Sequence, residues 1–205
     1  MESYITIEHA ASFEYEDRKS VFIGWAAPVS TEEEALAFIA AVKKKYPDAR
    51  HHVYAYVLRD RSISRFSDDR EPQGSAGMPV LDAIRKNGCT DTVIVVVRYF
   101  GGTLLGVGGL VRAYTEAAIG ALRLGNIVTY DLYTEYKIPL TYGEYQKFLS
   151  LAEERGFRIA DTDFAGEVTV LGTIKSERRE DFLRTLTDMS GGRILAECIC
   201  EKFSY

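Results

Sequence analysis

Short hydrophobic runs, separated by polar segments, extend over the first 130 residues and predict strands that alternate with helices. Strand-like runs occupy residues 4–7, 21–26 and 52–58, where β-branched and aromatic residues are frequent. Thr31, followed three residues later by Glu34, has the capping-box pattern that opens a helix, and apolar positions recur after it at helical spacing. This part of the chain is therefore predicted to form an α/β layer arrangement.

One apolar run differs from the others because it does not alternate with polar residues. Val93 to Val97 has the pattern of a strand buried on both faces. It leads through Arg98 into five glycines within residues 101–109, and a helical pattern follows over 110–124. Glycine lets the main chain approach a ligand closely, and the first N–H groups of a helix have no partner within it. This order of elements predicts an anion site built largely from backbone.

The pattern changes near residue 131 and then follows the order β-α-β-β-α-β. The predicted strands cover 132–140, 157–162, 168–174 and 193–203, and the predicted helices cover 141–155 and 176–189. Ser176 is the predicted N-cap of the second helix. The order is that of the ferredoxin-like split unit. The fold class is therefore predicted as α+β with two domains, residues 1–130 and 131–205.

Charge divides unequally between the two predicted domains. The chain has 205 residues, of which 46% are hydrophobic and 27% charged, with a net charge of −5. Residues 1–130 hold 15 Lys and Arg against 16 Asp and Glu, and residues 131–205 hold 10 against 14. A net charge of −5 argues against a protein that coats polyanions in general, but a local basic face is compatible with it. The first domain is thus the better candidate to approach a phosphate-bearing partner.

The three cysteines predict free thiols. Cys198 and Cys200 lie two residues apart on a predicted strand, so their side chains should share a face in a geometry that does not suit a mutual disulfide. An odd number of cysteines fits a reduced compartment. The sequence begins with no signal-peptide pattern and contains no apolar run near 20 residues. A cytoplasmic protein without membrane contact is therefore expected.

The glycine loop has two competing interpretations. It lacks the Lys-Ser or Lys-Thr pair of a P-loop and the glycine spacing of a dinucleotide site. In one interpretation the glycines only permit a tight turn and close packing. In the other they bind an anion or nucleic acid, with Arg98 and Arg112 converging on a phosphate. The predicted binding residues are Arg98, Gly101, Gly102, Gly106, Gly108, Gly109 and Arg112.

A polar turn before the next predicted helix holds three carboxylates within four residues, Asp68, Asp69 and Glu71. They could bind a divalent cation or act as acid and base, or they could cap the helix and pair with nearby arginines. The residues predicted to shape a cleft beside the glycine loop are Ser67, Asp68, Asp69, Glu71, Gly74, Ser75 and Gly77. His51 and His52 are adjacent on a strand and should face opposite ways. Neither a metal site nor a cofactor nor a catalytic residue is predicted.

Two long motifs resemble the signature of the IMPACT/YigZ family. One covers residues 97–102 and 105–114, and the other covers residues 66–77. Arg18-Lys19-Ser20 and His51-His52 also stand where that family has similar residues. The resemblance implies a first domain similar to the second domain of a small-subunit ribosomal protein and to domain IV of elongation factor G. It implies a ferredoxin-like second domain similar to domain V of that factor.

The resemblance also implies a connection with translation. Eukaryotic members regulate translation by competing for an activator of an initiation-factor kinase, with an additional N-terminal domain that this sequence lacks, and bacterial members are associated with RNA or ribosome contact. This chain departs from the family pattern at Arg70, where glycine is usual, at Met78, where a basic residue is usual, and at Leu104, where lysine is usual. Loss of two cations should weaken binding to nucleic acid.

The leading hypothesis is a non-enzymatic, translation-associated regulator that binds RNA or the ribosome through its first domain. No feature of the sequence is specific for DNA. One alternative is a metal-dependent enzyme acting on a phosphorylated metabolite or nucleotide, with Asp68, Asp69 and Glu71 around the metal. Another is a protein-binding regulator that makes no contact with nucleic acid and uses exposed aromatic residues such as Tyr54 and Tyr56.

Overall fold

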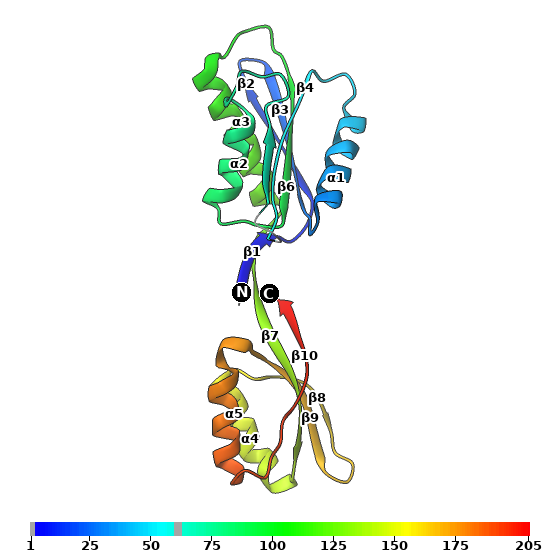
Figure 1. The fold of residues 1–205 in the computed structure, drawn as a ribbon, viewed down its shortest axis with the longest axis vertical. Helices are drawn as coiled ribbons and strands as arrows, with labels where there is room; N and C mark the ends of the chain where they lie inside the picture. Colours follow the sequence, from blue (N-terminus) through cyan, green and yellow to red (C-terminus); the bar gives the residue numbers. More distant parts are fainter. Residues whose placement is uncertain (1–2, 60–62) are drawn as a thin grey trace. The chain divides into compact units, whose positions relative to one another are not determined.

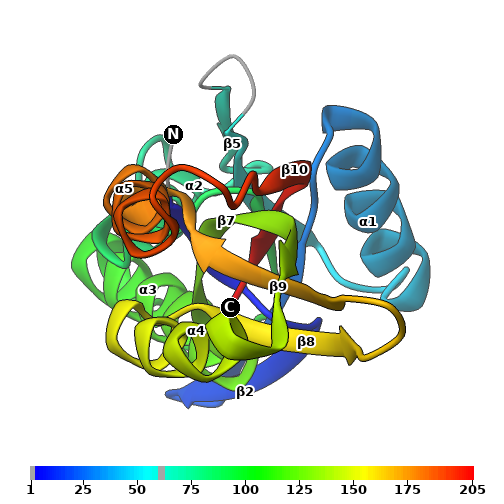
Figure 2. The ribbon, with the colours of Figure 1, turned by 90° about the horizontal axis from the view of Figure 1, so that it is seen from below.

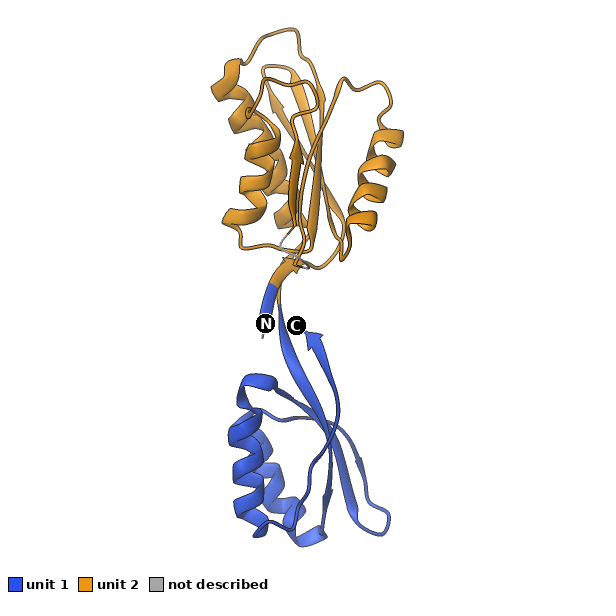
Figure 3. Ribbon diagram, in the orientation of Figure 1, with its two compact units in different colours: residues 1–4, 130–205 blue, residues 5–129 orange. Residues whose placement is uncertain are grey.

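The computed structural model describes residues 3–59 and 63–205, which form two compact units (Figure 3). The N-terminal unit is Ile5–Thr129. The C-terminal unit is Tyr130–Tyr205 together with Met1–Tyr4. The first strand, β1 (Ser3–Ile7), joins the sheet of the C-terminal unit through β7 (Ile127–Leu140).

A five-stranded sheet between two layers of helices makes up the N-terminal unit (Figure 1). Its strands are β2 (Ala11–Asp17), β3 (Ser20–Pro28), β4 (His51–Val57), β5 (Ser64–Ser67) and β6 (Thr92–Tyr99). Its helices are α1 (Glu32–Lys45), α2 (Gly77–Lys86) and α3 (Gly106–Leu124). The strand order is β2-β3-β6-β4-β5, and all neighbouring strands are antiparallel. Helices α2 and α3 cover one face, and α1 covers the other.

The central strand β6 is buried on both faces, as its unbroken apolar pattern predicts. Ile94 and Val96 pack into the core beneath α2 and α3, while Val93 and Val95 pack into the core beneath α1. Helix α3 packs so closely on β3 at Gly24 that a Cβ there would be only 2.3 Å from the Ala117 carbonyl oxygen. The end of β6 is thereby fixed between the two helical layers, and the glycine loop starts there.

Two edge strands of this sheet are absent from the sequence-based predictions. β2 forms a hairpin with β3, and β5 leads into the polar turn that holds the three carboxylates. Both have mostly polar or charged residues, and both are bound to one neighbour only. Backbone pairing, which leaves little trace in the side-chain pattern, holds such edges in place.

The C-terminal unit confirms the predicted ferredoxin-like fold. Its elements are β7, α4 (Tyr142–Arg155), β8 (Arg158–Asp163), β9 (Val168–Lys175), α5 (Arg179–Ser190) and β10 (Glu197–Ser204). The strand order is β10-β7-β9-β8, with antiparallel neighbours. Helices α4 and α5 lie side by side on one face of the sheet (Figure 2). Among the described residues, no helix has the length and hydropathy needed to cross a bilayer.

One of the two predicted helix starts in this unit is wrong. Thr141 and Glu144 form a complete capping box that opens α4. Ser176 does not cap α5, because it begins a short 3₁₀ turn and its Oγ lies 2.8 Å from Thr134 Oγ1 on β7. Helix α5 starts three residues later, at Arg179. A hydrogen bond to another element thus replaces the local cap that the sequence suggests.

The cysteines are free thiols, as predicted, and the strand that holds one pair is irregular between its two members. A bulge in β10 shifts the register between Cys198 and Cys200, so regular alternation does not hold across them. Both thiols are exposed. Cys89 is buried in the N-terminal unit, and burial raises the pKa of its thiol to about 11.

Candidate nucleic-acid interface

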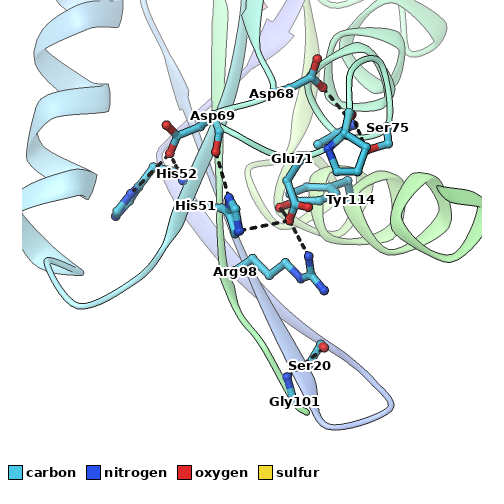
Figure 4. A network of polar contacts seen from close by, with 12 residues as sticks. Ser20, His51, His52, Asp68, Asp69, Glu71, Ser75, Arg98, Gly101 and Tyr114 are labelled. Atoms are coloured by element: carbon cyan, nitrogen blue, oxygen red, sulfur yellow. Dashed lines mark hydrogen bonds and ion pairs between the residues drawn. The ribbon is translucent and has the colours of Figure 1, made fainter. Parts of the chain in front are cut away.

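A buried carboxylate, Glu71, joins β6 and α3 to the turn before α2 (Figure 4). Arg98 Nη1 donates a hydrogen bond to Glu71 Oε1 at 2.6 Å, and the Tyr114 hydroxyl donates to the same oxygen at 2.8 Å. His51 Nε2 lies 3.9 Å from that oxygen. Burial and the neighbouring Glu71 carboxylate raise the pKa of Tyr114 well above its usual range. The phenol therefore stays protonated and remains a donor to the carboxylate.

This network places the Arg98 side chain inside the protein. Arg98 is only 6% exposed, and its guanidinium lies 5.4 Å from the ring centre of Phe22. Removal of one partner from a buried ion pair leaves the other charge uncompensated, at a cost of about 3–5 kcal/mol. Arg98 thus anchors the end of β6, and its side chain does not reach the surface where a phosphate would bind.

The neighbouring carboxylate, Asp68, caps helix α2 although it lies nine residues before the first residue of that helix. Its Oδ1 accepts hydrogen bonds from the N–H groups of Ala76 at 3.1 Å and Gly77 at 2.7 Å, and its Oδ2 accepts from Gly74 at 2.9 Å. The Ser75 hydroxyl donates to the Pro72 carbonyl oxygen at 2.6 Å. The α2 N-terminus is therefore already satisfied by a negative charge of the protein itself.

Asp69 turns the other way, toward β4. Its Oδ2 accepts a hydrogen bond from the His52 N–H at 2.6 Å, and its carbonyl oxygen lies 2.8 Å from His51 Nδ1. The Ser67 hydroxyl accepts from the Asp69 N–H at 3.2 Å. Asp69 and Arg70 both have positive φ, 39° and 70°, so the backbone turns sharply here. Internal hydrogen bonds of Ser67, Asp68, Asp69 and Glu71 hold the turn in place.

The three carboxylates therefore point toward three different partners (Figure 4). Asp68 binds the start of α2, Asp69 binds β4, and Glu71 binds Arg98. In the described part of the chain, no group of three histidine, cysteine or acidic side chains is placed to hold a metal ion. The hypothesis of a metal-dependent enzyme needs the three carboxylates around one ion, whereas each of them makes a separate structural contact.

The glycines of residues 101–109 have different structural roles. A Cβ on Gly101 would lie 2.0 Å from the Lys19 carbonyl carbon, and the Gly101 N–H donates to Ser20 Oγ at 3.0 Å. Gly102 and Gly106 have φ of 87° and 72°, a region that glycine adopts without strain. Gly101 therefore brings the loop into direct contact with the β2–β3 hairpin, and the other two set its path.

Helix α3 begins in this loop without the capping that α2 has. Its N-cap residue, Leu105, has an apolar side chain that accepts no hydrogen bond, and the first turn, Gly106-Val107-Gly108-Gly109, contains no acidic residue. A Cβ on Gly108 would meet nothing within 4 Å, so the backbone there is open. Among the described residues, no carboxylate bonds these N–H groups as Asp68 bonds those of α2. The positive end of a 19-residue helix is thus uncompensated.

Two cations that the site prediction omits lie against this loop. Arg18 and Lys19 form the two-residue turn between β2 and β3, and both are exposed with positive φ, 47° and 65°. Turns of this kind favour Asn-Gly, because β-carbons are strained in this region. The sequence could have pointed to these two cations through the arginine-lysine pair at a hairpin turn. That turn can be recognised only if β2 is known to be a strand. Arg112, which was predicted, is exposed on α3 and donates to Asp17 Oδ2 at 2.9 Å.

Exposed apolar side chains complete this end of the unit. Phe100 is 52% exposed, Leu104 82% and Val107 60%. The Phe100 ring centre lies 5.8 Å from the Arg98 guanidinium. We call the surface made by Arg18, Lys19, Phe100, residues 101–109 and Arg112 the loop–hairpin surface. It combines cations, open backbone N–H groups and an exposed aromatic ring.

The protein-binding alternative relied on Tyr54 and Tyr56, and one of these is not exposed. Tyr56 is buried and donates to Glu32 Oε1 at 2.5 Å, and burial raises its pKa to about 12. Tyr54 is half-buried and stacks on Tyr56, with ring centres 6.4 Å apart. This pair therefore packs between β4 and α1 and presents little aromatic surface to a partner.

Two protein families match this chain. The Impact N-terminal domain matches residues 18–122, just over half of the chain, and a domain of unknown function, DUF1949, matches residues 138–193. The first match spans the hairpin cations, the Glu71 network and the glycine loop. The chain belongs to the IMPACT family.

Relatives of this IMPACT family protein align with almost the whole chain. An IMPACT family member of Haemophilus influenzae is 36% identical over 202 residues, which are 97% of this chain and 98% of that protein. IMPACT family member YigZ of Escherichia coli is 34% identical over 197 residues, 95% and 97% of the two proteins. The crystal structure of a hypothetical protein aligns with a TM-score of 0.61 at 33% identity, over 98% of both chains.

The structure also locates the departures from the IMPACT family pattern. Arg70 has φ of 70°, which explains physically why glycine suits that position. Met78 and Leu104 are exposed at the surface. Replacement of a basic residue by these apolar ones therefore changes the surface charge and leaves the core unaffected.

Proposed function

We propose that this IMPACT family protein is a non-enzymatic, translation-associated regulator that binds RNA or the ribosome through the loop–hairpin surface. The observation that supports this most strongly is the turn of Arg18 and Lys19, which packs on Gly101 beside the uncapped start of α3. Two cations held in a strained backbone conformation bring positive charge to the open N–H groups of a helix start. Strain of this kind tends to persist where function requires it.

The small number of cations favours single-stranded RNA over duplex. Arg18, Lys19 and Arg112 supply three positive charges, and Arg112 is shared with Asp17. A surface with so few charges needs a further source of affinity, and stacking of a base on an exposed aromatic ring contributes about 1–3 kcal/mol. Phe100 provides such a ring next to the loop. Bases are accessible to it in single strands and are covered in a duplex.

The link to translation comes from the family. Eukaryotic members of the IMPACT family regulate translation, and the matched region in this chain contains the whole loop–hairpin surface. The Glu71 network joins β6 and α3, the two elements that flank the glycine loop, and the Gly101 N–H is bonded to Ser20, so the loop is tied to its neighbours before any partner binds. A preformed surface loses less conformational entropy on binding.

Salt-dependent RNA binding tests the proposal. Fluorescence anisotropy with a labelled single-stranded RNA should give a slope of log K against log salt of about −2, since each of three phosphate contacts contributes roughly −0.7. The triple variant Arg18→Gln, Lys19→Gln, Arg112→Gln should bring the slope close to zero. The matched control Arg85→Gln, Lys86→Gln, Arg123→Gln removes three charges from the last turns of α2 and α3, at the other ends of these helices, and should bind normally.

Binding to ribosomal fractions is measured in parallel by sedimentation. If neither RNA nor ribosomes bind with any dependence on salt, the proposal is wrong. If the triple variant binds as the native protein does, the partner is bound elsewhere and the loop–hairpin surface is not the interface.

A protein partner is the second candidate, and one observation favours it. A groove of about 220 Å³ between α2 and α3 is lined by Met78, Val111 and Ile119 together with six other residues. Met78 and Leu104 are exposed and apolar where the family resemblance places basic residues. Capture of partners from a lysate with and without nuclease separates the two functions, because a protein partner survives nuclease treatment and an RNA-mediated one does not.

A further inference from the structure

A second cationic site lies entirely within the C-terminal unit. A cleft of about 350 Å³ opens where the end of α4 meets the start of β8 and the end of β9. Its floor includes the buried residues Tyr133 and Phe157. Its charged lining residues are Glu153, Arg158, Lys175 and Arg178. Three cations thus converge on one cleft in a region with an excess of four acidic residues.

Two of these cations have no anionic partner. Within residues 3–59 and 63–205, neither Arg158 nor Arg178 forms an ion pair with a carboxylate. Half of the ten cations of residues 131–205 form an ion pair with a carboxylate. They are Arg155, Lys175, Arg179, Arg193 and Lys202. Among the described residues, Arg158 and Arg178 are the two cations without an ion pair that line this cleft.

Local packing holds both guanidinium groups at the cleft. The Arg158 guanidinium lies 4.9 Å from the ring centre of Tyr133. Arg178 Nη1 lies 3.3 Å from the position of a Cβ on Gly156, two residues before Arg158. Gly156 ends α4 with φ of 73°, so a larger residue there would be strained and would press on Arg178. A cation near a helix C-terminus is favourable in itself, and so is a guanidinium over an aromatic ring, so contacts other than ion pairs hold both arginines at the cleft.

We propose that this cleft binds the phosphate group of a small phosphorylated compound, with Arg158 and Arg178 as its ligands. A planar guanidinium matches phosphate in geometry and can donate two parallel hydrogen bonds. Lys175 adds charge at the rim, although Asp131 Oδ2 already accepts from its Nζ at 2.5 Å. Glu153 repels a second anion and accepts hydrogen bonds from hydroxyl groups. A sugar phosphate satisfies both requirements, and its size suits a cleft of this volume.

Amide chemical shifts of the full-length, ¹⁵N-labelled protein test this site and the loop–hairpin surface in one spectrum. Ribose 5-phosphate should shift the amides of residues 156–158 and 175–178, and ribose at the same concentration should leave them unchanged. Arg158→Gln, Arg178→Gln should lower the affinity on the order of tenfold or more, since charge-assisted hydrogen bonds are lost. Arg184→Gln removes an exposed arginine of α5 that does not line the cleft, and it should bind normally.

The source of the phosphate is decided by a second titration with an RNA trinucleotide that has no terminal phosphate. Shifts of the cleft amides by ribose 5-phosphate alone support a small ligand, and shifts by the trinucleotide alone assign the cleft to an RNA backbone phosphate. The proposal is overturned if neither probe moves these amides, or if the shifts persist in Arg158→Gln, Arg178→Gln. Shifts confined to residues 101–109 would overturn it as well, and they would leave the proposed function of the N-terminal unit intact.

Discussion

The strained turn of Arg18 and Lys19 gives a prediction in which stability and binding change in opposite directions. We expect Arg18→Asn, Lys19→Gly to stabilise the N-terminal unit, because Asn-Gly is the preferred sequence for a two-residue hairpin turn with positive φ at both positions. The same change removes two of the three cations of the loop–hairpin surface. A purely structural turn would show the first effect without the second.

The size of the stability gain follows from the backbone. A non-glycine residue in the left-handed region costs about 1–2 kcal/mol, and asparagine relieves part of this cost and glycine nearly all of it. The greater freedom of glycine in the unfolded chain offsets roughly 0.5–1 kcal/mol. The net gain for both positions is about 1–2 kcal/mol. With an m-value near 2 kcal/mol/M, the urea midpoint should rise by about 0.5–1 M.

Two measurements on the same preparations check the prediction. Urea unfolding followed by the fluorescence of Trp25, the one tryptophan of the chain, reports on the N-terminal unit. RNA anisotropy at several salt concentrations reports on binding, and the salt slope should shrink by about 1.4 as two phosphate contacts are lost. A lower or unchanged midpoint would refute the argument from backbone strain. Unchanged RNA affinity alongside a raised midpoint would show that the two cations have no part in binding.

Three further predictions concern the Glu71 ion pair, the Asp68 cap and the three cysteines. Glu71→Gln should destabilise it by about 3–5 kcal/mol in urea unfolding, because Arg98 would keep a buried charge without a counterion, and the double variant with Arg98→Met should recover part of that loss. Asp68→Ala should cost about 1–2 kcal/mol in the same assay, since the α2 N-terminus loses its acceptor, and a loss below 0.5 kcal/mol, about the lower limit for a cap, would contradict that role. At pH 8, a thiol reagent should modify Cys198 first, Cys200 more slowly because its hydrogen bond to Glu135 raises the pKa of the thiol, and Cys89 only on unfolding, because it is buried and burial raises its pKa to about 11. Equal rates for all three thiols would show that Cys89 is accessible.

Elements with a strong side-chain period were predicted well from the sequence. The unbroken run from Val93 to Val97 indicated a doubly buried strand, and the β-α-β-β-α-β order indicated the ferredoxin-like unit. Burial of both faces makes the run from Val93 to Val97 apolar at every position, and burial of one face makes β9 alternate between buried and half-buried residues, so both patterns are visible in the sequence. Ser176 shows the limit of local rules, since its hydroxyl bonds Thr134 on a distant strand.

The candidate site was predicted in part, and the errors share one cause. The glycine-rich segment lies where the pattern placed it, but α3 starts at Gly106 and not at the predicted residue 110, so three of the five glycines belong to the first turn of the helix. The burial of Arg98 depends on Glu71, which lies 27 residues earlier, and the role of Arg18 and Lys19 depends on contact with Gly101, about 80 residues later. The sequence around an arginine does not show which carboxylate its side chain will contact in the fold. Such long-range pairings need the fold before they can be recognised.

The sheet order of the C-terminal unit has a consequence for synthesis. β10 pairs with β7, and Lys202 on β10 bonds Glu135 on β7 across 67 residues of chain. The nascent polypeptide has all the residues of the N-terminal unit well before β10 leaves the ribosome. The N-terminal unit can therefore fold during translation, at a stage when β7 still lacks its pairing partner β10. We expect arrested nascent chains that stop before Glu197 to carry a protease-resistant N-terminal unit and a C-terminal unit that is still cleaved.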